Sequence, residues 1–142
     1  MPSPYVSVEQ LKLLVRNTLL AADTVTDLVD NRIHGAHLQD PDAKTVDFPL
    51  VVLDFKAGTV DWPGAYQNVT MDLWAYSRKS AGHALQIYDA CFDNLHQATL
   101  RQTGVKVAGY GQETIRPTEG WNDVVRGYYV QGEFTLRTGY RE

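Results

Sequence analysis

The spacing of apolar residues changes its period between residues 68 and 95. Apolar residues first occupy every second position, which predicts a strand with one face in the core. They then recur every three or four positions, which predicts an amphipathic helix with Ser77 and Ser80 available as caps. The strand's core face carries Val69, Met71, Leu73 and Ala75, and its other face carries Thr70, Asp72, Trp74 and Tyr76. The apolar stripe of the helix comprises Ala81, Ala84, Leu85, Tyr88, Cys91, Phe92 and Leu95.

Two helices are predicted near the start of the chain. Ser7 and Gln10 have the spacing of a capping box, and apolar residues follow at helical spacing. This first stripe comprises Val8, Leu11, Leu14, Val15, Thr18 and Leu19. Asp23 is placed to cap a second, short helix that ends near Asn31. The stretch from His34 to Asp47 is predicted to be a polar loop.

The remaining strands follow from apolar runs and from Gly and Pro positions. Residues 48–55 form a nearly unbroken apolar run, which predicts an interior strand with Pro49 at its start. Residues 56–65 are predicted to be a long connection. Gly104 is expected to stop the second long helix, and a short strand at 105–108 is then broken or bulged at 109–111. Residues 114–123, with Pro117 and Gly120, are predicted to be a turn or protruding loop.

The closing strand is predicted from alternation between residues 124 and 140. One face carries Tyr128, Val130, Gly132, Phe134 and Leu136, and the other carries Tyr129, Gln131, Glu133, Thr135 and Arg137. The order of elements predicts the α+β class: an antiparallel, possibly mixed, sheet of about four to five strands with two main helices on one face. We expect one domain over residues 1–142, with a flexible lead at 1–6 and the folded part at 7–138.

Charge and composition narrow the classes of partner. The chain has 13 Lys and Arg against 17 Asp and Glu, a formal charge of -4, and its basic residues are scattered. A nucleic-acid reader is therefore not indicated. No segment approaches the ~18 apolar residues of a membrane span, and no secretory signal is recognisable, so we expect a soluble protein that is not exported by the general routes. The single cysteine, Cys91, is expected to be a buried hydrophobic residue in a reducing compartment.

Candidate chemistry is sparse. His34 and His37, with Asp40 and Asp42 nearby, suggest a metal site, but the spacing is loose and solvated histidines are the favoured interpretation. No Gly-x-Ser-x-Gly turn is present, and Gly109-Tyr110-Gly111 lacks the rest of a phosphate-binding loop. Asp54, Asp61 and Asp72 are not singled out as paired carboxylates by their spacing. We therefore predict no enzymatic centre, metal or cofactor.

Aromatic residues are the unusual feature of the composition, with eight Tyr and three Trp. Tyr66, Trp74 and Tyr76 share the strand face opposite the helices, where the rings either lie flat on a solvated sheet or form a protein–protein surface. Trp62 and Trp121 fall in the two predicted long loops and are candidate anchors into a neighbouring subunit. The candidate interface residues are Trp62, Tyr66, Trp74, Tyr76, Trp121 and Arg137.

The chain resembles the tail-terminator or tail-completion proteins of long-tailed bacteriophages and related particles. The resemblance rests on the opening helix at 11–20, the segment at 25–34, the apolar strand at 48–53, the strand at 69–76 with its helix, and the terminal strand at 128–140. It spans almost the whole chain. His34 departs from the pattern, since an aromatic residue is more usual there.

The resemblance implies a virion protein that assembles in the host cytoplasm into a ring, typically a hexamer. Such a ring caps the tail tube, stops its polymerisation and presents a surface to the head-completion or stopper proteins at the neck. DNA passes through the ring without specific binding, and no membrane is involved. Two alternatives stay open: another neck component such as a head-closure protein, and a small α+β hydrolase or ligand-binding domain with a pocket of perturbed carboxylates or histidines.

Overall fold

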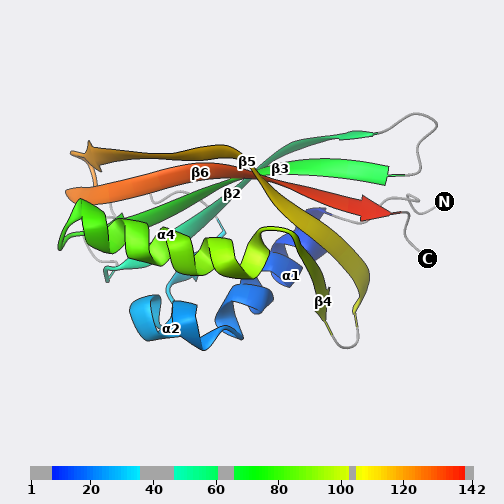
Figure 1. The fold of residues 1–142 in the computed structure, drawn as a ribbon, viewed down its shortest axis with the longest axis horizontal. Helices are drawn as coiled ribbons and strands as arrows, with labels where there is room; N and C mark the ends of the chain where they lie inside the picture. The colour runs from blue at the N-terminus through cyan, green and yellow to red at the C-terminus, as the bar shows by residue number, and fades with distance from the viewer. Residues whose placement is uncertain (1–7, 36–46, 61–65, 103–104, 140–142) are drawn as a thin grey trace.

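Alternating apolar residues on β3 (Tyr66–Ser77) and β6 (Gly127–Gly139) build the centre of a six-stranded sheet (Figure 1). The computed structural model describes residues 8–35, 47–60, 66–102 and 105–139. The strand order is β1-β2-β3-β6-β5-β4, with β1 (Ile33–His34), β2 (Leu50–Val60), β4 (Ala98–Gln102) and β5 (Val105–Asn122). Neighbouring strands are antiparallel except β1 and β2, which are parallel. The α+β class is confirmed, and the sheet has six strands in place of the four to five predicted, with one parallel pair in an otherwise antiparallel order.

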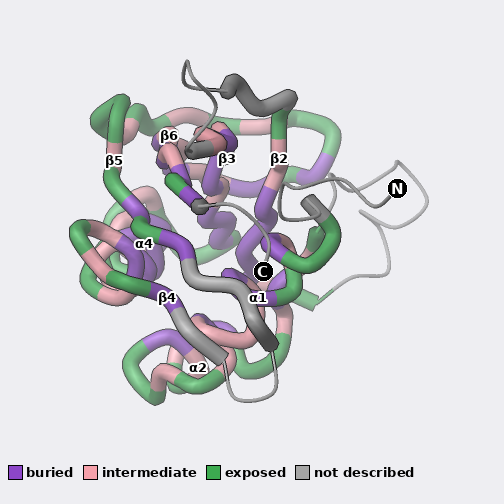
Figure 2. Tube along the Cα trace, turned by 90° about the vertical axis from the view of Figure 1, so that its right-hand side faces the viewer, coloured by how far each residue is buried: buried purple, intermediate pink, exposed green. Residues whose placement is uncertain are grey.

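Among the described helices, α1 (Val8–Leu20) and α4 (Ala81–Leu95) cover one face of this sheet, and α2 (Asp23–Val29) packs against both of them (Figure 1). The sheet is curled, so that α1 contacts both β4 at one edge of the sheet and β2 near the opposite edge (Figure 2). Between helices and sheet lies the main core, which includes Leu14, Val15, Met71, Cys91 and Phe134, each at most 1% exposed. The predicted core face of β3 is confirmed, because all four of its apolar residues have no exposed surface.

The helix α4 has the predicted start. The Ser80 side chain accepts a hydrogen bond from the backbone N–H of His83 at 3.0 Å, and so satisfies one of the unpaired donors of the first turn. Ile87 and Leu95 are fully buried against the sheet. Burial of these two side chains contributes roughly 3–6 kcal/mol as an upper estimate, so docking of α4 is a main source of stability.

The first connections differ from the sequence prediction. The N-cap of α2 is Ala22, without a side-chain bond, and Asp23 is the first helical residue, where its charge still complements the helix dipole. β2 continues to Val60, so 56–60 is strand: Gly58 lies at a shift of register, which is a bulge instead of a turn. His34 lies in β1, where it is the partner of Val52 in β2. Residues 36–46 and 61–65 of the predicted loops lie outside the described residues.

The second half of the chain differs more. α4 ends at Leu95, well before Gly104, because Gln97 takes a positive φ of 53° and the chain turns into β4, a strand that was not predicted. Residues 109–111 do not break β5, which pairs without interruption there with both β4 and β6. Gly111 is required by packing, since a Cβ at this position would collide with the carbonyl oxygen of Leu95.

The predicted loop at 114–123 is also wrong, because this stretch is the second half of β5. β4 pairs with β5 only as far as Gly111, so the stretch lies at an outer edge of the described sheet. Pro117, which lacks an N–H, falls in a shift of register between Ile115 and Thr118. The true turn is at 123–126, where the Asn122 side chain accepts from the backbone N–H of Val124 at 2.9 Å, and β6 begins at Gly127.

Candidate interaction surfaces

The sheet face turned away from the helices, here called the open face, has three zones in sequence along β3 and β6. By register, its residues on β3 are the even-numbered ones and on β6 the odd-numbered ones. An aromatic zone lies where β3 ends, an ionic zone lies in the middle, and a polar groove lies where β3 begins. The open face therefore offers different chemistry at its two ends.

The aromatic cluster comprises Phe48, Leu50, Val52, Trp74, Tyr76, Val125 and Tyr129. Trp74 and Tyr76 stack with ring centroids 6.1 Å apart and planes 8° apart, and Tyr129 lies 5.2 Å from Trp74. Tyr76 is only 4% exposed, and burial, reinforced by Tyr129, raises the pKa of its hydroxyl to about 12. Trp74 and Tyr129 are half-buried. The cluster is thus a second, small apolar core whose rings support one another.

Two connections close the aromatic cluster from the side. Val125, in the β5–β6 turn, is 5% exposed, and Phe48 precedes β2. The Arg78 guanidinium donates to the Val125 carbonyl at 3.0 Å and lies 4.0 Å from the centre of the Phe48 ring. The guanidinium therefore fixes both connections against the sheet.

The ionic zone explains how the open face tolerates opposed carboxylates. Asp54 on β2 and Asp72 on β3 are direct cross-strand partners, an arrangement that is unfavourable without a cation. Lys56 supplies it: its Nζ lies 3.0 Å from Asp72 and 3.8 Å from Glu133. The hydrogen bond to Asp72 and the charges of the surrounding carboxylates raise the pKa of Lys56. Two of the three candidate carboxylates thus come together as a structural ion-pair network, while Asp61 lies outside the described residues.

The polar groove has a volume of about 280 Å³ and is lined by Asn68, Tyr110, Gln112, Thr114, Thr135 and Arg137. Arg137 is exposed and stands opposite Asn68 on β3 and Tyr110 on β5. Among its lining residues only Arg137 is charged. The groove is therefore a mostly neutral surface of hydroxyl and amide groups.

The hairpin end, defined as Trp121, Asp123, Val124 and Tyr128, lies where β5 turns into β6. Trp121 is 50% exposed and Val124 is 60% exposed. The Trp121 ring meets Tyr128 edge-on at 4.9 Å, and its indole N–H donates to Asp123 Oδ1 at 2.7 Å. These two contacts orient the indole although half of its surface faces solvent.

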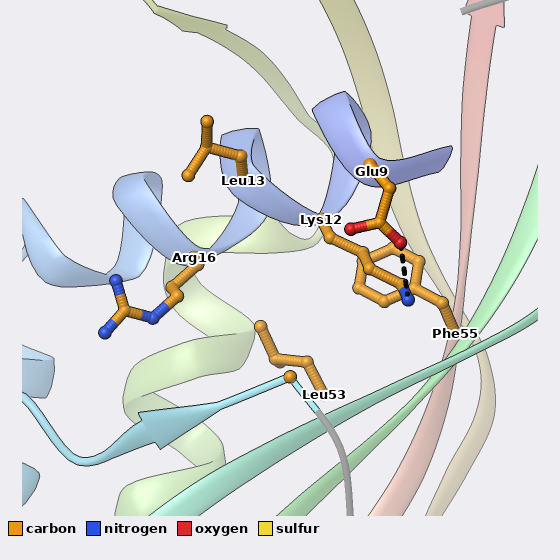
Figure 3. Close-up of a pocket in the computed structure, with 7 residues that line it drawn as sticks. Glu9, Lys12, Leu13, Arg16, Leu53 and Phe55 are labelled. Atoms are coloured by element: carbon orange, nitrogen blue, oxygen red, sulfur yellow. Dashed lines mark hydrogen bonds and ion pairs between the residues drawn. The ribbon is translucent and has the colours of Figure 1, made fainter. Parts of the chain in front are cut away.

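A cleft of about 250 Å³ lies between α1 and β2 (Figure 3). Glu9, Lys12, Leu13 and Arg16 line it from α1, Leu53 and Phe55 line it from β2, and Gly35 completes it. Lys12 pairs with Glu9 at 3.2 Å and lies 6.0 Å from the centre of the Phe55 ring. The Arg16 Nε–H donates to the Ile33 carbonyl at 3.0 Å. The cleft, here called the α1–β2 cleft, therefore has an apolar floor and a basic rim on which two bases, Lys12 and Arg16, outnumber one acid, Glu9.

The remaining candidate chemical groups have structural surroundings. Burial raises the pKa of the Cys91 thiol to about 12. Burial and the nearby Arg16 charge lower the pKa of His34. Within the described ranges, no group of three His, Cys, Asp or Glu side chains is arranged to hold a metal ion, and His37, Asp40 and Asp42 lie outside those ranges. None of the described helices has the length and apolar character needed to cross a membrane.

The predicted interface residues fall in several places. Trp74 and Tyr76 meet in the aromatic cluster, Arg137 lies in the polar groove, and Trp121 lies at the hairpin end. Trp62 lies outside the described residues, as does the side chain of Tyr66, the first residue of β3. Sequence reasoning missed the α1–β2 cleft. Its signal in the sequence is Leu13, an apolar residue off the predicted stripe of α1 and 50% exposed.

Comparison with known proteins identifies a solved structure that shares this fold. No protein-family model matches the sequence, and no curated protein matches it. Among solved structures, a chain from the virion of a native gene transfer agent particle superposes with a TM-score of 0.66 at 18% sequence identity. The match covers 91% of this chain and 94% of that chain. The two chains therefore share a fold over nearly their whole lengths.

Proposed function

We propose that this chain is a structural protein of a phage-like virion, and that it acts there as a tail terminator. In this role, copies of the chain form a ring, expected to be a hexamer, that caps the tail tube and ends its polymerisation. The ring then presents a surface to the head-completion proteins, and DNA passes through its centre. The proposal is of a structural, non-enzymatic role.

The observation that carries the proposal is the shared fold with a chain of a gene transfer agent virion over almost the full length of both chains. The order of helices and strands that suggested the tail-terminator resemblance is largely present in the structure. A small ligand-binding enzyme is less well supported, because the two described hollows, the α1–β2 cleft at about 250 Å³ and the polar groove at about 280 Å³, are both smaller than the roughly 300–1,000 Å³ of most ligand pockets.

The distribution of surfaces is compatible with a ring. A ring needs two different complementary patches on each copy, and further surface for the tube below and the neck above. The chain offers the hairpin end, the α1–β2 cleft and the two ends of the open face as separate surfaces.

Tube length tests the proposed role. A tail-tube protein from the same particle should be polymerised alone and with increasing amounts of this chain, and tube lengths measured by negative-stain electron microscopy. We expect shorter tubes with a narrower length distribution as the chain is added. Unchanged lengths, with binding to head-completion proteins instead, would identify a different neck component.

A further inference from the structure

We propose that the hairpin end of one copy docks into the α1–β2 cleft of the next copy, with Trp121 as the anchor. This inference rests on the proposed ring and names the surfaces that close it. Five large apolar side chains are exposed in the described part of the chain, and two of them, Trp121 and Val124, lie at the hairpin end. A third, Leu13, lines the cleft.

Trp121 has the properties of an interface anchor. An indole carries a large apolar area and loses little conformational entropy on binding when it is already oriented. Here Tyr128 and Asp123 hold the ring in place in the free subunit. The backbone edge of β5 is unsuited to strand addition, because Pro117 and two shifts of register interrupt it. The contact is therefore made through side chains.

The α1–β2 cleft matches this anchor in size and in charge. Its volume of about 250 Å³ is suited to one aromatic side chain more than to a separate ligand. Leu13, Leu53 and Phe55 offer apolar contacts to an indole. Asp123, which accepts a hydrogen bond from the indole, would enter beside Arg16, with which no carboxylate of the described residues pairs, while Lys12 already pairs with Glu9 of the same cleft. The basic rim also supplies cation–π partners for the ring.

The positions of the two patches favour a contact between copies. β2 and β5 are separated by β3 and β6, and Trp121 lies four residues along β6 from the level of Leu53. These offsets amount to roughly 14 Å across the sheet and about 13 Å along it, so Trp121 cannot reach the cleft of its own chain. A contact between two different patches repeats head to tail, and it closes into a ring when the rotation per copy fits.

Two variants and two matched controls test the contact, with sedimentation velocity on the protein alone and electron microscopy of tube ends. Trp121→Ala and Leu13→Glu should each weaken ring formation at least about tenfold. The controls are Ile115→Ala, an apolar residue of β5 that is 54% exposed, and Gln10→Glu, an exposed residue of α1 that does not line the cleft. Both controls should assemble like the wild type.

Mixing the two variants gives a sharper result. Trp121→Ala keeps an intact cleft and Leu13→Glu keeps an intact hairpin end, so the mixture should form pairs but no rings. Rings that persist in Leu13→Glu, or in a folded Trp121→Ala, would overturn this contact and leave the proposed function standing. A wild-type chain that never self-associates, alone or with the tube protein, would overturn both. If circular dichroism shows Trp121→Ala unfolded, Leu13→Glu decides.

Discussion

Tyr88 shows how single residues set the spacing between helix and sheet. Its side chain is 1% exposed, and its hydroxyl donates to Glu113 Oε2 at 2.6 Å across the core. The ring passes directly over Gly132 in β6, where a Cβ would collide with the hydroxyl. Gly132 is therefore selected by close approach of a side chain, since any other residue would push α4 away from the sheet.

Gly132→Ala should destabilise the fold by about 1–3 kcal/mol, because the added methyl group overpacks the contact with Tyr88. Gly82→Ala is the matched control: the position is exposed and lies in α4, where Ala is the better helix former. The control should leave stability unchanged or raise it by roughly 0.4–1 kcal/mol. Urea unfolding followed by circular dichroism measures both. Equal stabilities of the two variants would contradict the tight packing at Gly132.

Cys91 should be inert in the folded protein. It has no exposed surface, and burial raises the pKa of its thiol to about 12, so the reactive thiolate is scarce at pH 8. We expect no reaction with Ellman's reagent until denaturant is added, and then release of one thiol equivalent. Rapid labelling of the native protein would show that α4 opens readily or is packed differently.

At the scale of elements, β3 serves two cores with its two faces. Its odd-numbered residues from Val69 to Ala75 enter the main core, and Trp74 and Tyr76 enter the aromatic cluster on the open face. The two residues differ in exposure, because Tyr76 is 4% exposed while Trp74 is half-buried. Trp74 therefore has surface available to a partner, whereas Tyr76 acts mainly inside the subunit.

Trp74→Ala should cost less than the ~3–5 kcal/mol typical of a core Trp, and its circular dichroism should stay close to the wild type. We expect the variant to weaken rings or tube capping, because an exposed aromatic surface is lost. Tyr76→Ala provides the contrast and should lose more stability. A Trp74→Ala chain that is unfolded would show that Trp74 serves folding, and an unfolded variant could not report on assembly.

The sequence predicted those elements in which the spacing of apolar residues along the chain reveals the buried face. Most of the α4 stripe and the alternation of β3 and β6 were recognised because apolar positions repeat with the period of each element, although the predicted stripe left out the buried Ile87. β4 was not recognised because the predicted helix was expected to continue to Gly104, and most of β5 was not recognised because its Gly111, Pro117 and Gly120 are typical of turns. The two glycines are instead required by contacts between distant parts of the chain, because Gly111 faces a backbone carbonyl and Gly120 faces the Tyr129 ring.

The candidate surfaces, too, could be predicted only where their residues lie close together in the sequence. Trp74 and Tyr76 were placed together because they are two positions apart on one strand. The α1–β2 cleft was out of reach, since Leu13 and Phe55 lie far apart in sequence and meet only in the folded chain. No local pattern encodes such a juxtaposition.

For the whole molecule, charge bears on how a ring would treat DNA. Each phosphate neutralised by Lys or Arg strengthens binding and steepens its salt dependence, so a dense basic lining would retard the genome. The chain carries a net charge of -4, and Lys56 is already engaged by carboxylates of the open face. A ring built from this chain is therefore better suited to let DNA pass than to bind it.

We therefore expect weak duplex binding, with a Kd on the order of 10⁻⁴ M or poorer at physiological salt, and no sequence preference. Fluorescence anisotropy with a labelled duplex at roughly physiological ionic strength measures this. Submicromolar affinity would contradict a ring through which DNA passes without specific binding, and would indicate a protein that holds nucleic acid.

Cryo-electron microscopy of tubes assembled with this chain tests the central claim most directly. The proposed role predicts a single ring of this chain at one end of each tube, with the fold of Figure 1 fitting each subunit of the ring. Neighbouring subunits should be related by one repeated rotation, as expected for a closed ring. Tube ends without this chain, or copies bound along the tube wall, would contradict the role of tail terminator.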